Sequence, residues 1–365
     1  MIAPEVVTGA FVCLMAVFVA LCVLIAGIRG ARGYRNRRRE RIAAPVRPLL
    51  LELLCADEAE QGWPLLRLAE MDRRTWKALE PTLAEMLGKV SGTARSGLVR
   101  LYELRGATEN AVCELGSLRA NRRGRAAQVL GRLGHRPAVP ELCRLLADHD
   151  PEVRLSAARA LGRVGDARAV PYLLESLRGS RAVPPGTVTR ALTLLGPEAL
   201  RGIAAGLEHS EPLARAVSIE VLGATGAVSR TTEIARALRD DPHTEVRIKA
   251  ARALGRLGMP DGLEPLMEAV RPGHPVGLRI VAAGALGSLG ALAATGPLGR
   301  LLGDPDPHVA ATAARALLRL GLAGEDTLRA AADDPAGGPA AAHARAALAE
   351  ASVGSRLDVR VEVAL

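Results

Sequence analysis

Residues 150–177 read DPEVRLSAARALGRVGDARAVPYLLESL, and this stretch predicts two short amphipathic helices joined by a turn. Asp150 is a good N-cap, and Pro151 occupies a first-turn position where a missing N–H costs nothing. The apolar stripe of the first helix consists of Val153, Ala157, Ala160, Leu161 and Val164. Gly165 is expected to end this helix in the left-handed conformation that glycine adopts without penalty. Residues 166–177 then form the second helix.

The closing glycine recurs along most of the chain at a nearly constant spacing. It stands at Gly134, Gly165, Gly196, Gly226, Gly258, Gly290 and Gly321, in steps of 30 to 32 residues. An Ala-Ala-x-x-Leu-Gly phrase precedes several of these glycines, as at residues 157–162 and 250–255. Its small residues allow neighbouring helices to approach closely. One helix pair cannot bury its stripe alone, so the pattern predicts an all-α protein, an α-solenoid of stacked helix pairs with a period of about 31 residues.

These repeats resemble HEAT repeats of the short bacterial type, which includes phycobilisome-lyase-like proteins. The resemblance rests on DPEVRLSAARALGRVG at residues 150–165 and DPHTEVRIKAARALGRLG at residues 241–258, and it is specific from Arg119 to Gly321. The unit from Pro185 to Gly196 is a weak member, with proline at the usual arginine place.

The resemblance also implies a ladder in which a first-turn arginine reaches an aspartate of an adjacent repeat. We expect Asp150 and Asp241 among the acceptors. The candidate arginines are Arg123, Arg154, Arg215, Arg247 and Arg279.

The N-terminus predicts a membrane anchor. Val6 to Ile28 is a run of 23 residues without a charge, long enough to cross a bilayer. A cleaved signal peptide fits less well, because no basic region precedes the run and no cleavage site follows it. The basic flank consists of Arg29, Arg32, Arg35, Arg37, Arg38, Arg39 and Arg41. It predicts a single-pass cell-membrane protein with its N-terminus outside and its solenoid in the cytoplasm, and it could hold anionic lipid headgroups.

Five segments follow from these patterns. Residues 1–28 are the transmembrane helix, 29–45 a basic juxtamembrane linker, 46–118 degenerate helical repeats that cap the solenoid, 119–351 the HEAT-repeat solenoid, and 352–365 a C-terminal tail. In the tail, Leu357, Val359, Val361 and Val363 alternate with polar residues. We favour a frayed tail, and the alternative is a strand that adds to the sheet of a partner.

No catalytic, cofactor or metal motif is found in the sequence. It has no Gly-rich phosphate loop, no Gly-x-Ser-x-Gly, no His-Glu-x-x-His and no paired-cysteine spacing. It also lacks the His-Glu dipeptide expected of deoxyhypusine hydroxylases, whose repeats are similar. We interpret five histidines as polar turn residues along one edge of the solenoid: His149, His209, His243, His274 and His308. We therefore expect no enzyme activity, no cofactor and no metal.

An arginine face remains as the candidate partner site. Six and two residues before a closing glycine stand Arg159 and Arg163, Arg252 and Arg256, and Arg315 and Arg319. Like charges at i and i+4 slightly destabilise a helix, so the arrangement favours an acidic partner. The alternative is composition bias, because the chain has 45 arginines and 3 lysines.

The sequence therefore predicts a membrane-anchored cytoplasmic scaffold that docks a protein, acidic or membrane-associated, on its repeat surface. The alternatives are a lyase-like enzyme or enzyme subunit, or a binder of anionic lipid or nucleic acid. Nucleic acid is disfavoured, because the basic flank carries most of the formal net charge of +9.

Overall fold

The computed structural model describes Met15, residues 18–23, 26–27, Arg29, Tyr34, 37–335 and 338–362, with backbone only beyond residue 352. Every regular element in these ranges is a helix, which confirms the all-α class. The chain divides into two compact units, Met1–Cys113 and Glu114–Leu365.

The first unit is a small helical cluster. Its helices are α2 (Arg47–Cys55), α3 (Gly62–Ala69), α4 (Arg73–Met86) and α5 (Gly92–Leu104), and α6 (Ala107–Glu114) runs up to the boundary. Buried leucines from α2 to α5 form its core. Trp76 stacks edge-on against Tyr102 with ring centroids 5.2 Å apart, and the guanidinium of Arg105 lies 4.9 Å from the Trp76 ring centroid. Trp76 is thus a packing residue, whereas Trp63 is exposed.

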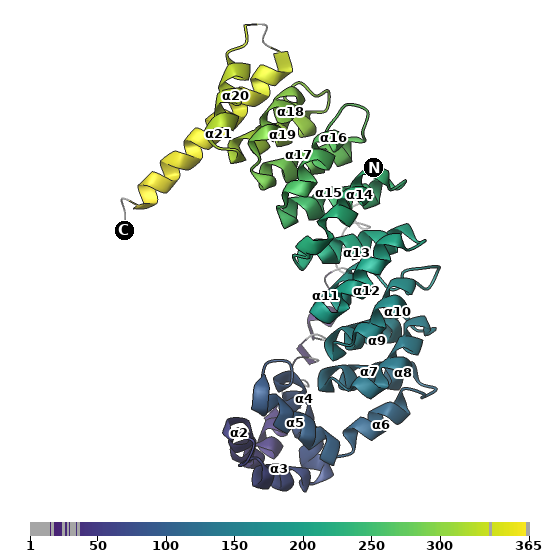
Figure 1. Ribbon diagram of the computed structural model, residues 1–365. Coiled ribbons are helices and arrows are strands. Elements are labelled where there is room, and N and C mark those ends of the chain that lie inside the picture. Colours follow the sequence, from purple (N-terminus) through teal and green to yellow (C-terminus); the bar gives the residue numbers. More distant parts are fainter. Residues whose placement is uncertain are drawn as a thin grey trace, which may run out of the picture. The chain divides into compact units, whose positions relative to one another are not determined.

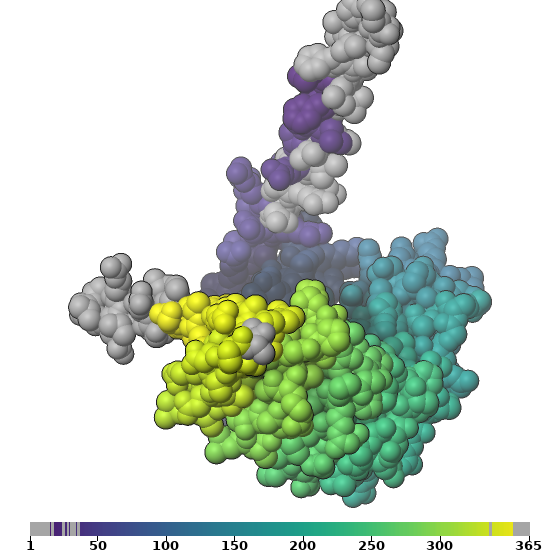
Figure 2. Space-filling model, turned by 90° about the horizontal axis from the view of Figure 1, so that it is seen from above, coloured from purple at the N-terminus to yellow at the C-terminus, as the bar shows by residue number. Residues whose placement is uncertain are grey.

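The second unit is a stack of helix pairs, which confirms the α-solenoid. Its long helices are α7 (Ala120–Leu133), α9 (Pro151–Val164), α11 (Pro185–Leu194), α13 (Pro212–Ala224), α15 (Thr244–Leu257), α17 (Val276–Leu289) and α19 (Pro307–Arg319). Its short helices are α8 (Val139–Arg144), α10 (Val170–Glu175), α12 (Leu200–Ala205), α14 (Thr231–Asp240), α16 (Leu263–Ala269) and α18 (Thr295–Leu301). The long and the short helices form two rows (Figure 1). Successive repeats pack into one continuous surface, and α20 (Leu322–Ala332) and α21 (Gly338–Glu362) end the unit (Figure 2).

The predicted caps are present at both ends of the long helices. The Asp150 carboxylate accepts hydrogen bonds from the N–H groups of Glu152 and Val153, so α9 begins as expected. Gly165 closes α9 at φ 72°, and all seven closing glycines have positive φ. The predicted second helix is shorter than expected. In the unit of α9 it consists of a 3₁₀ turn, Ala167–Ala169, followed by α10.

Glycine-to-alanine contacts set the spacing of the long helices. A Cβ built on Gly131 would lie 2.6 Å from the Cα of Ala160, and one on Gly287 would lie 2.8 Å from the Cα of Ala316. The same approach joins Gly162 to Ala191, Gly223 to Ala253 and Gly255 to Ala285. The backbones of neighbouring long helices therefore touch directly. The small residues of the repeated phrase have the role that the sequence predicted.

An arginine–aspartate ladder connects successive repeats at three places. Nε and Nη2 of each arginine donate hydrogen bonds of 2.6 to 3.1 Å to the two carboxylate oxygens of one aspartate. This aspartate lies in the turn before the next long helix. The pairs are Arg123–Asp148, Arg215–Asp241 and Arg279–Asp304. Burial raises the pKa of Asp148 and of Asp241, but the hydrogen bonds and charge of their arginines lower it further, so both lie below the ordinary value.

The predicted ladder is wrong in three details. Asp150 caps its own helix instead of accepting an arginine, and Asp148, two residues earlier, is the acceptor. Arg154 keeps the ladder position but has no carboxylate partner in the part of the chain that the structure describes. Arg247 forms no ion pair within the described residues, and its Nε is buried without a hydrogen bond. The repeat of Arg247 has the same 32-residue step as the repeat of Arg215, which pairs with Asp241 26 residues later, and the residue 26 positions after Arg247 is Gly273.

The structure tests the prediction for the C-terminal tail but not the prediction of an N-terminal membrane span. Most of Val6–Ile28, the predicted membrane span, lies outside the described residues, so that span stays a prediction. Of the helices that the structure does describe, none combines the length and the apolar character needed to cross a bilayer. At the C-terminus, α21 runs through Glu362, so the strand alternative for residues 357–363 is wrong up to that residue.

Replacement of Gly287 by alanine should destabilise the protein. The new methyl group would meet the α19 backbone at Ala316, and overpacking of this kind costs about 1–3 kcal/mol. Gly284→Ala, one turn earlier in α17, is the matched control, because its Cβ would contact only Thr312 Cγ2 at 3.8 Å. There the better helix propensity of alanine should leave stability unchanged or raise it. Thermal unfolding of both variants checks this, and equal melting temperatures would contradict the contact.

Arg279→Ala should lower stability far more than Arg247→Ala does. The first change leaves Asp304, whose side chain is 4% exposed, buried and unpaired, and removal of one partner of a buried pair costs about 3–5 kcal/mol. Arg247 binds no carboxylate among the described residues, so its replacement leaves no buried carboxylate without a partner. Chemical denaturation of the two variants measures the difference. If the Arg279→Ala variant has the same midpoint of chemical denaturation as the wild type, the ladder does not stabilise the fold.

Candidate functional site

The six arginines of the predicted partner site lie on the row of long helices. Arg159 and Arg163 belong to α9, Arg252 and Arg256 to α15, and Arg315 and Arg319 to α19. All six side chains are exposed. None forms an ion pair with any residue that the structure describes, although most exposed arginines of the short-helix row do. The three pairs thus present unneutralised positive charge to solvent.

Arginines of α7 and α9 lie close enough to influence one another. Shielding by neighbouring protein, together with the positive charges of Arg132 on α7 and Arg159 on α9, lowers the pKa of Arg163 below its ordinary value. Like charges are therefore held close enough to act on one another. An anionic group placed here would relieve that repulsion.

The predicted arginine face is not continuous along the row. The equivalent positions hold Arg190 and Leu194 on α11, Glu220 and Ala224 on α13, and Gly284 and Ser288 on α17. Glu220 accepts an ion pair from Lys249 of α15 at 2.9 Å. Arg319 donates a hydrogen bond to Ser288 Oγ at 3.4 Å, so it is partly engaged. The site consists of three basic clusters, each an arginine pair, and the equivalent positions between them hold one exposed arginine (Arg190), the paired Glu220, and neutral residues.

An open hollow lies between the first two clusters, and sequence reasoning missed it. It has a volume of about 710 Å³ and is lined by residues of α11, α13 and α15, among them Pro185, Thr189 and Leu194. Leu194 is 55% exposed and occupies a position where other repeats carry arginine. One feature of the sequence could have indicated this irregular repeat: Thr193 stands where other repeats have the glycine of the Ala-Ala-x-x-Leu-Gly phrase.

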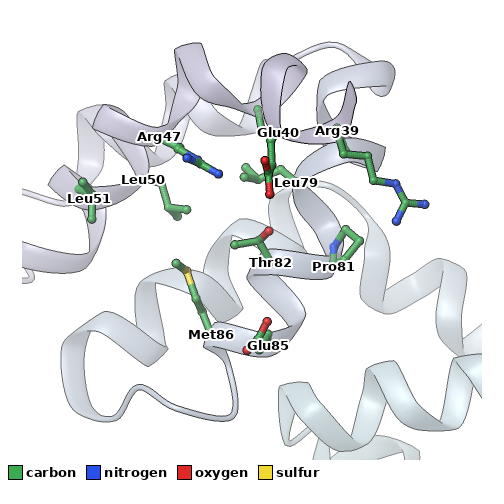
Figure 3. A pocket seen from close by; sticks show the side chains of 12 residues that line it. Arg39, Glu40, Arg47, Leu50, Leu51, Leu79, Pro81, Thr82, Glu85 and Met86 are labelled. Atoms are coloured by element: carbon green, nitrogen blue, oxygen red, sulfur yellow. The ribbon is translucent and has the colours of Figure 1, made fainter. Parts of the chain in front are cut away.

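The predicted lipid-headgroup arginines are only partly placed. Arg32 and Arg35 lie outside the described residues, whereas Arg29, Arg37, Arg38, Arg39 and Arg41 lie inside them. Arg39 borders an open pocket of about 460 Å³ in the first unit, with an apolar floor that includes Leu50 and Leu79 (Figure 3). In Figure 3 the Arg47 guanidinium points toward Glu40, and Arg39 points away from the pocket. Glu40 and Glu85 also line this pocket, so it has mixed charge and is not a basic site for an anionic headgroup.

The histidines behave as turn residues. His209 Nδ1 accepts a hydrogen bond from the N–H of Glu211 at 3.1 Å, and His243 Nδ1 lies 3.2 Å from Nη2 of Arg215. His308 lies in the first turn of α19, not before it. Within the part of the chain that the structure describes, no group of three or more His, Cys, Asp or Glu side chains could hold a metal ion.

Known proteins share the repeat and the fold. The family described as HEAT repeats matches residues 114–192 and 200–276. No curated protein sequence matches the chain. Among solved structures, the complex of CpcE and CpcF of phycocyanin lyase from a Nostoc species is 26% identical, with a TM-score of 0.31, and the match covers 61% of this chain and 92% of that chain.

Two further structures are similar at lower identity. The karyopherin Kap121p bound to the extreme C-terminus of the protein phosphatase Cdc14p is 13% identical, with a TM-score of 0.50, and the match covers 85% of this chain but 41% of that chain. Human deoxyhypusine hydroxylase in complex with glycerol is 18% identical, with a TM-score of 0.31, and the match covers 76% of this chain and 96% of that chain. The likeness to the karyopherin supports the fold alone. Residues 114–192 and 200–276 of the second unit thus match HEAT repeats, and they lie within an all-α solenoid of stacked helix pairs.

Proposed function

We propose that this protein is a non-catalytic scaffold that docks an acidic protein partner on the long-helix row of its solenoid. The observation that carries the proposal is the set of six exposed arginines, none of them neutralised by a carboxylate among the described residues. Elsewhere in the same repeats, arginines are neutralised inside the fold, as in the ladder and on the short helices. On the short-helix row, Arg144, Arg178, Arg236 and Arg271 form ion pairs, whereas none of the six exposed arginines does so among the described residues, and composition bias alone does not predict this difference.

The geometry of the row favours a protein over a small substrate. Its basic clusters are spread over α9, α15 and α19, and the hollow between the first two is open and bordered by Leu194. A small-molecule site usually encloses most of the ligand's surface and has a few polar groups that point toward the ligand. Charged clusters spread around a hollow that has both apolar and charged lining residues, such as Leu194 and Arg190, are typical of a surface that meets another protein.

The proposal includes a single-pass anchor at Val6–Ile28, with the solenoid on the cytoplasmic side of the cell membrane. Its support is in the sequence. The run is free of charge for 23 residues, and seven arginines follow it within the next 13. Such a flank is typical of the cytoplasmic side of a membrane span. The anchor would hold the long-helix row near membrane-associated partners.

Replacement of all six arginines by glutamine should weaken capture of the partner and leave the fold intact, since none of them belongs to the core. Single exposed charges contribute only about 0.2–1 kcal/mol, so the changes are combined. The control variant replaces one exposed arginine on each short helix or just after it, at Arg144, Arg178, Arg201, Arg236, Arg271 and Arg300. It changes the net charge equally on the other row.

The measurement is a pull-down from membrane extract with the full chain in mild detergent, at low and at moderate salt. We expect the long-row variant to lose proteins that the wild type and the control both retain, most clearly at low salt. Equal recovery by all three proteins at both salts would reject the docking site. Loss that is equal in the two variants would point to net charge alone.

Reporter fusions after residue 45 should be active only in the cytoplasm, because the arginine flank retains the following chain there. A fusion of the same reporter before residue 6 should show the opposite location. The chain should also keep its N-terminal segment when isolated from membranes. An active periplasmic reporter after residue 45 would contradict the proposed topology.

A further inference from the structure

The positive charge of the first basic cluster continues from α9 onto α11. A Cβ built on Gly162 of α9 would lie 2.7 Å from the Cα of Ala191 of α11, so the two backbones touch at this point. Arg163 directly follows Gly162, Arg190 directly precedes Ala191, and both arginines are exposed. Two arginines of neighbouring helices thus lie beside one backbone contact.

Arg159 adds a third positive charge beside this contact. It is exposed and stands four residues before Arg163, so both side chains lie on the same face of α9. Neither of them nor Arg190 forms an ion pair with a residue that the structure describes. These three residues, the α9–α11 arginine group, therefore attract carboxylates of another molecule.

An apolar surface adjoins the α9–α11 arginine group. Leu194 lies one turn after Arg190 on α11, is 55% exposed and borders the open hollow of about 710 Å³. Its position is that of Arg163 in the preceding repeat, so an apolar side chain replaces a charged one. Arg190 lines the same hollow. A molecule that enters the hollow thus meets a leucine and an arginine together.

The remaining charges of the hollow are paired with each other. Among the described residues that line it, Glu220 is the one carboxylate, and Nζ of Lys249 donates a hydrogen bond to it at 2.9 Å. The unpaired charge of the hollow is therefore that of Arg190. Charge complementarity favours an anionic occupant, and Leu194 favours an occupant that also carries an apolar side chain.

We infer that the α9–α11 arginine group and the hollow bind an acidic segment of a partner protein in which an apolar side chain follows or precedes the acidic residues by about three positions. The inference rests on the proposed function and specifies the sequence that the partner carries. Neighbouring long helices lie roughly 8–10 Å apart, which is the separation between the arginines of α9 and Leu194 on α11. An extended segment spans this separation with about three residues, at roughly 3.3 Å each.

The test measures binding of fluorescein-labelled peptides to the full chain in mild detergent at low salt. Each peptide has two adjacent aspartates in a Gly-Ser background, with one leucine placed one to six positions away on either side. We expect the tightest binding at a separation of about three residues. Replacement of that leucine by serine should weaken binding about five- to tenfold, because the leucine is partly buried in the complex.

Three outcomes of this peptide series would overturn the inference. They are the absence of binding by every peptide, binding that does not depend on the leucine, and binding that is tightest at a separation outside about two to four residues. Binding of aspartate peptides without any effect of the leucine would show a surface that attracts negative charge alone.

Two variants locate the bound peptide. Leu194→Gln should remove the gain in affinity that the leucine gives, whereas Leu322→Gln on α20, where the leucine is 77% exposed, should keep it. Arg190→Gln should weaken binding of the aspartate peptides about two- to fivefold, and Arg201→Gln on α12 should leave it unchanged. A gain from the leucine that survives Leu194→Gln would overturn the site.

The peptide experiment can fail separately from the pull-down, because Arg190 and Leu194 are not among the six arginines replaced there. Loss of partners by the six-glutamine variant, with no effect of the leucine on the peptides, would keep the scaffold and reject the inference. Leucine-dependent peptide binding, with unchanged capture of partners by the six-glutamine variant, would reject the six-arginine docking site and keep the binding site on α11.

Discussion

The contact between a glycine of one long helix and an alanine of the next is the constraint on which the rest of the solenoid depends. At five junctions a side chain on the glycine would meet the neighbouring helix at 2.6 to 2.9 Å, so no larger residue fits without a shift. Close backbone approach fixes the register of one repeat on the next. A first-turn arginine can then reach an aspartate about 25 residues later, and the arginines beside the glycine are directed to solvent.

One repeat departs from this rule in several ways at once. In the unit of α11, Thr193 replaces the glycine, Pro185 replaces the ladder arginine, and Gly179 replaces the aspartate that would receive Arg154. Thr193 is exposed, and its hydroxyl donates a hydrogen bond to the carbonyl oxygen of Thr189 at 2.9 Å. Leu194 of this repeat borders the open hollow, and Arg154 of the preceding repeat has no carboxylate partner among the described residues. The least regular repeat is thus the one beside which the structure has an open hollow and an arginine without a carboxylate, and neither feature stabilises the fold.

Periodicity in the sequence was enough to predict the solenoid, its helix caps and the close packing of its small residues. It was not enough to choose between Asp148 and Asp150, because both stand in the turn before α9 and only the geometry decides which one faces Arg123. Arg247 matched the ladder pattern in sequence, but Gly273 stands where its aspartate would be. The positions of the arginines alone do not show whether each one has an aspartate partner. The exposed surface of the six arginines was predictable, whereas the interruption at Glu220 depends on its bond to Lys249.

The spacing of the basic clusters limits the kind of partner that can use them together. Long helices pack about 8–10 Å apart, so α9 and α15, three repeats apart, are separated by roughly 25–30 Å, and α15 and α19 by roughly 16–20 Å. One compact anion would reach a single cluster. An acidic segment that meets all three must be extended along the row or belong to a folded surface of similar length. The hollow bordered by Leu194 then faces the part of that surface between the first two clusters, where an apolar side chain could contact Leu194 and a carboxylate could contact Arg190.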